Sequence, residues 1–176
     1  MSKSARTTQL VTVALLITIE IILSRICSVF MPTGFRIGLG FLPVAMVAIL
    51  YGPWWSGAAY ALGDIFGFFL FPSGQYMPGF TLTAFLTGMT FGLFLYRHDV
   101  TFKRTFAASL TVVTICNLVL DTFWLYLLYD QAIAVLIPMR LLKCAATLGL
   151  QVTLIPFIWK RCLLKIPQLR SAVSGR

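Results

Sequence analysis

Polar and aromatic side chains recur at helical spacing within an otherwise apolar stretch in the second half of the chain. Asn117, Asp121 and Trp124 are separated by four and then three residues, which places them on one face of a helix. An amide and a carboxylate can hydrogen-bond the edge of a heterocycle, and an indole ring can stack on its face. This face therefore predicts a binding site for a flat, nitrogen-containing ring.

A second polar face follows in the last apolar stretch. Its members lie at near-helical spacing and are Arg140, Lys143, Thr147 and Gln151. We expect the two faces to line one cavity that can hold both planar and anionic groups. In the alternative interpretation, Asp121 only pairs with Arg140 or Lys143 and neutralises the interior.

Arginines near the start of the chain could bind an anion. Arg25 and Arg36 flank a stretch rich in Pro and Gly at 31–40, and guanidinium groups hold carboxylates through paired hydrogen bonds. An ionisable side chain at membrane depth is costly unless it is paired or hydrated, so Asp64 and Asp121 also mark functional positions. The arginines predict a substrate with one or two carboxylates.

Signatures of catalysis and of metal binding are missing from the sequence. His98 is the only histidine, no H-E-x-x-H motif is present, and no Gly-rich phosphate loop precedes a Lys and a Ser or Thr. Cys27, Cys116, Cys144 and Cys162 are widely separated and form neither a zinc motif nor a disulfide framework. We therefore expect no enzyme, no metal and no cofactor. If the chain moves a solute uphill, the energy must come from an ion gradient or from a separate protein.

The elements that carry these residues are predicted to be membrane helices. The chain is 59% hydrophobic and 11% charged, with a mean hydropathy of +0.91, whereas soluble domains are about a quarter charged. A helix needs roughly 20 residues to cross a ~30 Å hydrocarbon core. We expect an all-α integral membrane protein, a six-transmembrane-helix bundle that forms one domain over 1–176, with helices at 7–31, 37–51, 54–71, 80–96, 105–129 and 133–159.

The distribution of basic residues sets the expected orientation in the bilayer. Loops on the cytoplasmic side are enriched in Lys and Arg, and a topology with both termini in the cytoplasm places most of the 14 Lys and Arg residues on that side. Six crossings satisfy this rule, and so do four crossings with a re-entrant pair, since segment 37–51 is short. Most of the net charge of +9 then lies on the cytoplasmic face, where anionic lipids attract basic residues. Nucleic acid is a poor partner, because the basic residues flank helices and form no groove.

Small residues recur at every fourth position in two neighbouring predicted helices. Gly63 and Gly67 form one stripe, and Ala84, Gly88 and Gly92 form the other. Helices in a bilayer associate where small residues let their backbones approach. We expect these stripes to pack inside the bundle; the alternative is that they dock on another membrane protein.

Three stretches of the sequence carry a family resemblance: RIGLGFLP at 36–43, GDIFGFFLFPSG at 63–74 and PGFTLTAFLTG at 78–88. They resemble the substrate-binding S component of energy-coupling-factor (ECF) vitamin transporters, and most closely its folate-specific branch. The resemblance covers nearly the whole chain, and the Phe-rich motif of the second and third stretches is its most specific part.

The resemblance implies a subunit of a bacterial cell membrane that captures a vitamin at the outer face. Such a subunit docks on a transmembrane scaffold, EcfT, which is driven by two cytoplasmic ATPase subunits. It is thought to topple in the membrane and so to carry its closed pocket inward. The family's docking patch on the first helix is an Ala-xxx-Ala motif, in which Ala14 matches the first position and Thr18 replaces the second alanine.

Folate agrees with the polar residues found above. The aminopyrimidinone edge of its pterin suits the carboxylate of Asp121 or Asp64, and its ring suits stacking on Trp124 or Phe80. Its glutamate tail carries two carboxylates, which suit the cationic side chains. We expect the substrate to be bound by Arg25, Arg36, Asp64, Phe80, Asn117, Asp121, Trp124, Arg140 and Lys143.

Two alternative functions remain open. The chain could be an S component for another vitamin, riboflavin or thiamine, although the outer arginines disfavour cationic thiamine. It could also be a stand-alone channel or proton-coupled carrier that uses Asp64 and Asp121. Its small size and the lack of evident inverted repeats speak against a complete secondary transporter.

Overall fold

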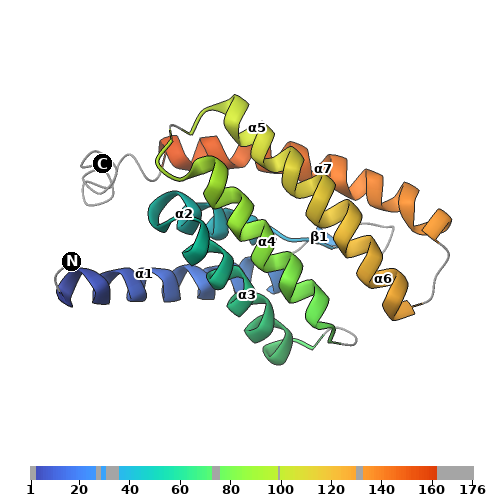
Figure 1. Ribbon diagram of the computed structural model, residues 1–176, viewed down its shortest axis with the longest axis horizontal. Coiled ribbons are helices and arrows are strands. Elements are labelled where there is room, and N and C mark those ends of the chain that lie inside the picture. Colours follow the sequence, from blue (N-terminus) through green and yellow to red (C-terminus); the bar gives the residue numbers. More distant parts are fainter. Residues whose placement is uncertain are drawn as a thin grey trace.

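The chain is almost entirely helical in the computed structural model, which describes residues 3–26, 29–30, 36–72, 76–98, 100–129 and 133–161 (Figure 1). The first part contains α1 (Lys3–Ile21), the π-helical turn η1 (Ile22–Ile26), β1 (Val29–Phe30), β2 (Arg36–Ile37), α2 (Phe41–Tyr51), α3 (Pro53–Leu70) and α4 (Pro78–Leu95). The second part contains α5 (Phe102–Thr111), the π-helical η2 (Val112–Leu120), α6 (Asp121–Tyr129) and α7 (Ile133–Arg161). Because η1 continues α1, and α5, η2 and α6 are continuous, the described chain forms six helical segments. The predicted all-α six-helix bundle is confirmed.

The second helical segment begins later than the sequence predicted. Residues 36–37 form strand β2, so helix α2 begins at Phe41 and the predicted start at residue 37 was wrong. Extended pairing and the glycines at 38 and 40 both oppose a helix over this stretch. The two strands pair antiparallel, with Val29 opposite Ile37 and Phe30 opposite Arg36. The predicted end of the first segment, Met31, lies outside the described residues.

Helix α2 is too short to cross a bilayer by itself. Its 11 residues span roughly 16 Å at 1.5 Å per residue, about half of a hydrocarbon core. Val47 and Ala48 are fully buried, so neighbouring helices shield α2, and Gly52, with a φ of 92°, turns the chain directly into α3. Among the described residues, four stretches are long and apolar enough to span a membrane, namely Arg6–Ile26, Pro78–Leu95, Phe102–Leu128 and Arg140–Trp159.

Glycines allow α4 to pack closely on α3. A Cβ on Gly88 would overlap the carbonyl oxygen of Ser56, and a Cβ on Gly92 would overlap the backbone of Pro53. The backbones therefore touch where the sequence places small residues. The prediction that the α4 stripe packs inside the bundle is confirmed.

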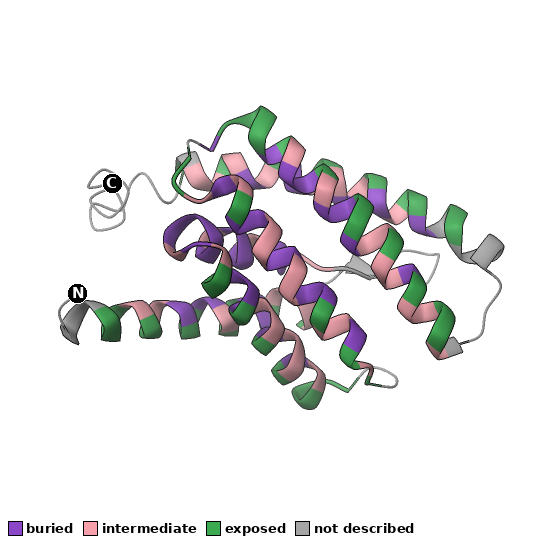
Figure 2. Cartoon of the chain, viewed as in Figure 1, coloured by how far each residue is buried: buried purple, intermediate pink, exposed green. Residues whose placement is uncertain are grey.

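The bundle has two parts that meet along a buried seam. Helices α1 to α4 form one part, and the continuous α5, η2 and α6 lie beside α7 in the other (Figure 1). Helix α4 contacts α5 and η2, and α2 contacts α7, so these elements join the two parts. Many buried positions lie on the sides of the helices that face one another, while exposed positions face outward (Figure 2). The core at the seam includes Phe41, Ala48, Phe91, Leu95, Val112 and Ile155.

Candidate functional site

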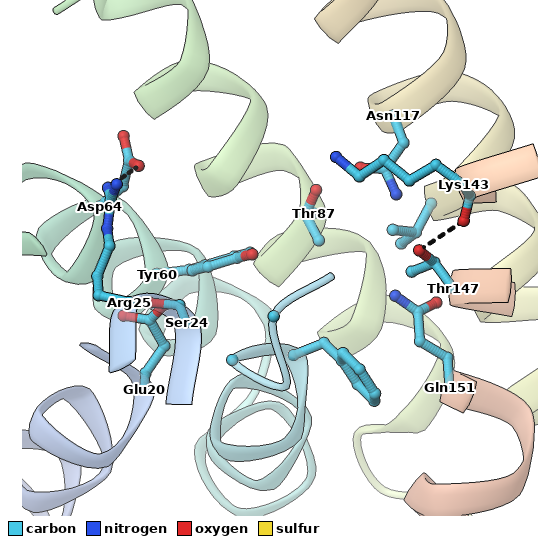
Figure 3. A pocket seen from close by; sticks show the side chains of 14 residues that line it. Glu20, Ser24, Arg25, Tyr60, Asp64, Thr87, Asn117, Lys143, Thr147 and Gln151 are labelled. Atoms are coloured by element: carbon cyan, nitrogen blue, oxygen red, sulfur yellow. Dashed lines mark hydrogen bonds and ion pairs between the residues drawn. The ribbon is translucent and has the colours of Figure 1, made fainter. Parts of the chain in front are cut away.

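A cavity of about 280 Å³ lies between the two parts of the bundle. One side, the first wall, is formed by α1, η1 and α3 and consists of Glu20, Ser24, Arg25, Tyr60 and Asp64 (Figure 3). The opposite side, the second wall, is formed by η2 and α7 and includes Asn117, Lys143, Thr147 and Gln151. Thr87 of α4, Phe41 of α2, Val112 of η2 and the glycines at 38 and 40 complete the lining. Enclosure combined with a few convergent polar groups is typical of small-molecule sites.

A second hollow, beside α6 and α7, has a volume of about 310 Å³ but a different lining. It is bordered by Leu118, Val119, Thr122, Phe123, Tyr126 and Ile137. No charged side chain occurs among these described residues, and most are apolar, which suits lipid chains better than a polar solute. The polar cavity at the seam is therefore the candidate site.

Near the first wall, charged and hydroxyl side chains bind one another across three helical segments. Arg25 Nη2 lies 3.5 Å from Asp64 Oδ1 and so joins η1 to α3. Asp64 Oδ2 accepts a 2.9 Å hydrogen bond from the hydroxyl of Thr81 on α4, and the hydroxyl oxygens of Thr81 and Tyr76 are 3.1 Å apart. Both carboxylate oxygens of Asp64 are therefore engaged, and Asp64 orients Arg25.

Glycines on α3 make room for charged side chains of the first helical segment. A Cβ on Gly63 would overlap Oε2 of Glu20, and a Cβ on Gly67 would lie 3.1 Å from Nε of Arg25. Glu20 itself is only 3% exposed. The small-residue spacing on α3 thus builds a cradle for two charged groups as well as a packing face.

The second wall depends on π-helical backbone. The main-chain carbonyl of Asn117, within η2, accepts a 2.8 Å hydrogen bond from Nη1 of Arg140. The Arg140 side chain is buried and directed at this main chain, whereas Lys143, Thr147 and Gln151 line the cavity. The Thr147 hydroxyl donates to the Lys143 carbonyl at 2.8 Å. π-Helical turns are frequent at functional sites, and here one holds an amide side chain at the cavity.

The structure divides the predicted substrate-binding residues into two groups. Those that line the cavity are Arg25, Asp64, Asn117 and Lys143. Those that do not occur among its described lining residues are Phe80, Asp121, Trp124 and Arg140. Arg36 lies in β2, and its side chain is outside what the structure describes. On α1, Ala14 and Thr18 are exposed, and the Thr18 hydroxyl donates to the Ala14 carbonyl at 3.0 Å.

The structure corrects the expectation that Asn117, Asp121 and Trp124 share one cavity face. That expectation assumed α-helical spacing, whereas Asn117 lies in η2 and Asp121 is the first residue of α6. A π-helix turns by fewer degrees per residue than an α-helix, so the two stretches are out of phase. Trp124 instead donates its indole N–H to the Thr83 hydroxyl at 3.1 Å and covers Gly79, where a Cβ would overlap the ring.

Several lining residues were missed by sequence reasoning. Those with polar side chains are Glu20, Ser24, Tyr60 and Thr87. Glu20 gave a signal, because it is an acidic residue inside an apolar segment. The other three are ordinary residues for an apolar helix, and only the neighbours that they meet in the fold bring them to the cavity.

Comparison with known proteins places the chain in a family. Residues 8–159 match the family model of the substrate-specific component of ECF transporters. Two relatives are folate transporters named FolT. One, from Clostridium novyi (strain NT), is 39% identical over 147 residues, which cover 84% of this chain and 85% of that protein. The other, from Leuconostoc mesenteroides subsp. mesenteroides, is 30% identical over 127 residues, which cover 72% and 68%.

A solved structure has the same fold. A crystal structure of FolT bound with folic acid matches with a TM-score of 0.80 and 33% sequence identity, covering 92% of this chain and 95% of that chain. Because the matched family consists of substrate-binding components of transporters, the prediction that the chain is not an enzyme is confirmed. The chain belongs to the substrate-specific components of ECF transporters, the family that its sequence motifs resemble.

Proposed function

We propose that the chain binds folate as the substrate-specific component of an ECF transporter. The observation that carries this proposal is the polar cavity at the seam of a bundle that matches a folic-acid-bound FolT over 92% of the chain. Folate combines a flat pterin, which has hydrogen-bonding edges, with a glutamate tail that has two carboxylates. The cavity offers both kinds of partner, because its walls carry cations, carboxylates, amides and hydroxyls.

The cationic side chains are suited to the acidic tail. Arg25 has several N–H donors, so its contact with Asp64 leaves others for a ligand carboxylate. Lys143 on the second wall adds a second cation. Arg36, in the strand after the 31–35 stretch, is assigned to the same role. On the second wall, Asn117 supplies an amide for the ring.

Four of the residues that the sequence predicts to bind the substrate act indirectly in this proposal. Arg140 positions η2 through the Asn117 carbonyl, and Trp124 ties α6 to α4 through Thr83. Asp121, the first residue of α6, interacts electrostatically with Lys143 and Arg140. Phe80 lies in the first turn of α4. The direct contacts with the ligand are assigned to the residues that line the cavity.

Basic residues indicate which end of the bundle faces the cytoplasm. The starts of α1 and α5 and the ends of α4 and α7 lie toward one end of the bundle (Figure 1). Exposed basic side chains accompany these ends, at Arg6, Arg97, Lys103, Arg104 and Arg161. By the positive-inside rule this end is cytoplasmic. Both termini then lie on the cytoplasmic side of a bacterial cell membrane, and the cavity is accessible from outside the cell.

The length and end residues of α3 are consistent with a crossing. Its 18 residues span about 27 Å. Trp54 and Trp55 are exposed at its start, and Phe69 and Phe71 are exposed at its end. Trp is enriched at the interfaces of a bilayer, which suits the start of α3.

Delivery into the cell is assigned to partner subunits. The chain has no Gly-rich phosphate loop of its own, so hydrolysis of ATP is assigned to two ATPase subunits that act through the EcfT scaffold. The exposed face of α1 that contains Ala14 and Thr18 is the proposed docking surface. Leu15 and Ile22 on α1 and η1 are also exposed there.

Binding and uptake measurements test the proposal. The purified protein is expected to bind folate in calorimetry, and folded protein without a folate signal would contradict it. Liposomes are expected to take up folate only when the chain is combined with EcfT, the two ATPase subunits and ATP. Uptake by the chain alone would instead favour a stand-alone carrier, and a yellow co-purified ligand would favour riboflavin.

A further inference from the structure

Glu20 places a carboxylate at the cavity that the rest of the described chain does not fully use. Its side chain is 3% exposed and lines the cavity near the end of α1. Among the residues that the structure describes, Oε2 has no hydrogen-bond partner. Buried polar atoms are normally paired, because removing them from water is costly. Oε2 is therefore a buried acceptor at the edge of the cavity that no described donor satisfies.

Glycines on two other elements shape this position. A Cβ on Gly63 of α3 would overlap Oε2 of Glu20, and a Cβ on Gly40, just before α2, would lie 2.9 Å from Oε1. A side chain at either position would displace the carboxylate. Three elements are thus fitted around one carboxylate, as expected of a built site.

The other carboxylate of the cavity is occupied by protein groups. Asp64 uses Oδ1 for Arg25 and Oδ2 for Thr81, so it has little capacity left for a ring. Asp121, the remaining candidate for the ring, is absent from the described lining. Glu20 also bonds the Ser24 side chain, but it is the lining carboxylate that keeps one oxygen without a described partner.

We propose that Glu20 recognises the ring of the ligand by accepting hydrogen bonds from two adjacent N–H groups of an aminopyrimidinone edge. An ionised carboxylate is an acceptor with two oxygens, and it binds paired N–H donors well. Tyr60 extends from α3 beside this carboxylate toward Thr87 (Figure 3). An aromatic ring therefore lies next to the carboxylate that accepts the hydrogen bonds. The inference rests on the proposed function and adds to it the residue that selects pterins carrying a 2-amino group.

A comparison of two ligands and two variants tests this role. The ligands are folate and 2-desamino-folate, in which hydrogen replaces the 2-amino group, and the variants are Glu20→Gln and Asp64→Asn. Wild-type protein is expected to bind folate about 10- to 100-fold more tightly than the desamino compound, as for a charge-assisted hydrogen bond. Glu20→Gln is expected to lose most of this preference. Asp64→Asn, which acts through Arg25, is expected to weaken both ligands by the same factor.

Each result bears on the inference. Equal binding of the two ligands by wild-type protein, or an unchanged preference in Glu20→Gln, overturns it. Should Glu20→Gln fail to fold, Glu20→Asp keeps the charge but withdraws the carboxylate, and the preference is again expected to fall. Binding of 4-aminobenzoyl-glutamate, which lacks the pterin, is expected to be the same in wild type and Glu20→Gln. If wild-type protein binds neither folate compound, the proposed function is overturned as well. If it binds both compounds equally, only the role of Glu20 is overturned.

Discussion

The two walls of the cavity are held together in different ways. On the first wall, Arg25, Asp64 and Thr81 bind one another and join η1, α3 and α4. On the second wall, side chains are bound mostly by main chain, since Arg140 donates to a carbonyl of η2 and Thr147 to a carbonyl of its own helix. The first wall is thus built by tertiary contacts between side chains, and the second by the backbone path of η2 and α7.

This difference predicts how the walls respond to substitution. A change on the first wall removes a partner from another helix and leaves a charged or polar group without it, which is costly at membrane depth. A change on the second wall removes a contact whose other member is a main-chain carbonyl. Where that contact lies within one helix, as for Thr147, the backbone keeps its path, so the effect on folding is smaller.

Substitution of Gly63 should have the largest effect. In Gly63→Ala, the new Cβ overlaps the carboxylate of Glu20, so we expect a loss of about 2–3 kcal/mol in the free energy of unfolding and a clear loss of folate affinity. Thermal unfolding in detergent and calorimetry would measure both.

Gly149 on α7 provides the matched control. Apart from its chain neighbours and the backbone of its own helix, a Cβ at this position meets no described atom within 4 Å, and Ala favours a helix over Gly by up to about 1 kcal/mol. Gly149→Ala should therefore leave folding unchanged or stabilise it, with folate affinity preserved. Equal losses in the two variants would show that the cradle on α3 has no special role.

The apolar segments could be predicted from the sequence because each needs only length and composition. The polar face of the last segment was also found, since Lys143, Thr147 and Gln151 lie within one continuous α-helix and keep its spacing. The apolar segments and this polar face both depend only on residues that are near one another in the chain. The number of helices and this part of the cavity could therefore be predicted.

The remaining features could not be predicted because they depend on neighbours. The π-helical backbone of η2 shifts Asn117 out of phase with Trp124, and no local residue pattern marks such a turn. The stripe at Gly63 predicts close packing on this face of α3, but the sequence does not reveal that the Glu20 carboxylate fills the space beside Gly63. Which charged residue meets which helix is decided by packing in three dimensions.

Removal of the Asp64 carboxylate should have an intermediate effect. Asp64→Ala takes the partner away from both Arg25 and Thr81. Because the pair is partly exposed to the cavity, we expect a loss of about 1–2 kcal/mol in stability and about a tenfold loss of folate affinity through misplacement of Arg25. Asp64→Asn keeps an acceptor for Thr81 and should lose less stability. If both variants unfold at the wild-type temperature, the network does not stabilise the first wall.

The smallest effect is expected from Thr147 on the second wall. Its hydroxyl donates to the carbonyl four residues earlier at 2.8 Å, and Thr153 makes the same local bond to Gly149 at 2.8 Å on an exposed face. Replacing either Thr by Val removes this bond, so both variants should change the free energy of unfolding by less than about 1 kcal/mol. Only Thr147 lines the cavity, so Thr147→Val alone should weaken folate, by a few fold in calorimetry. Equal folate affinities in the two variants would place the ligand away from this part of α7 and confine its polar contacts to the first wall, Asn117 and Lys143.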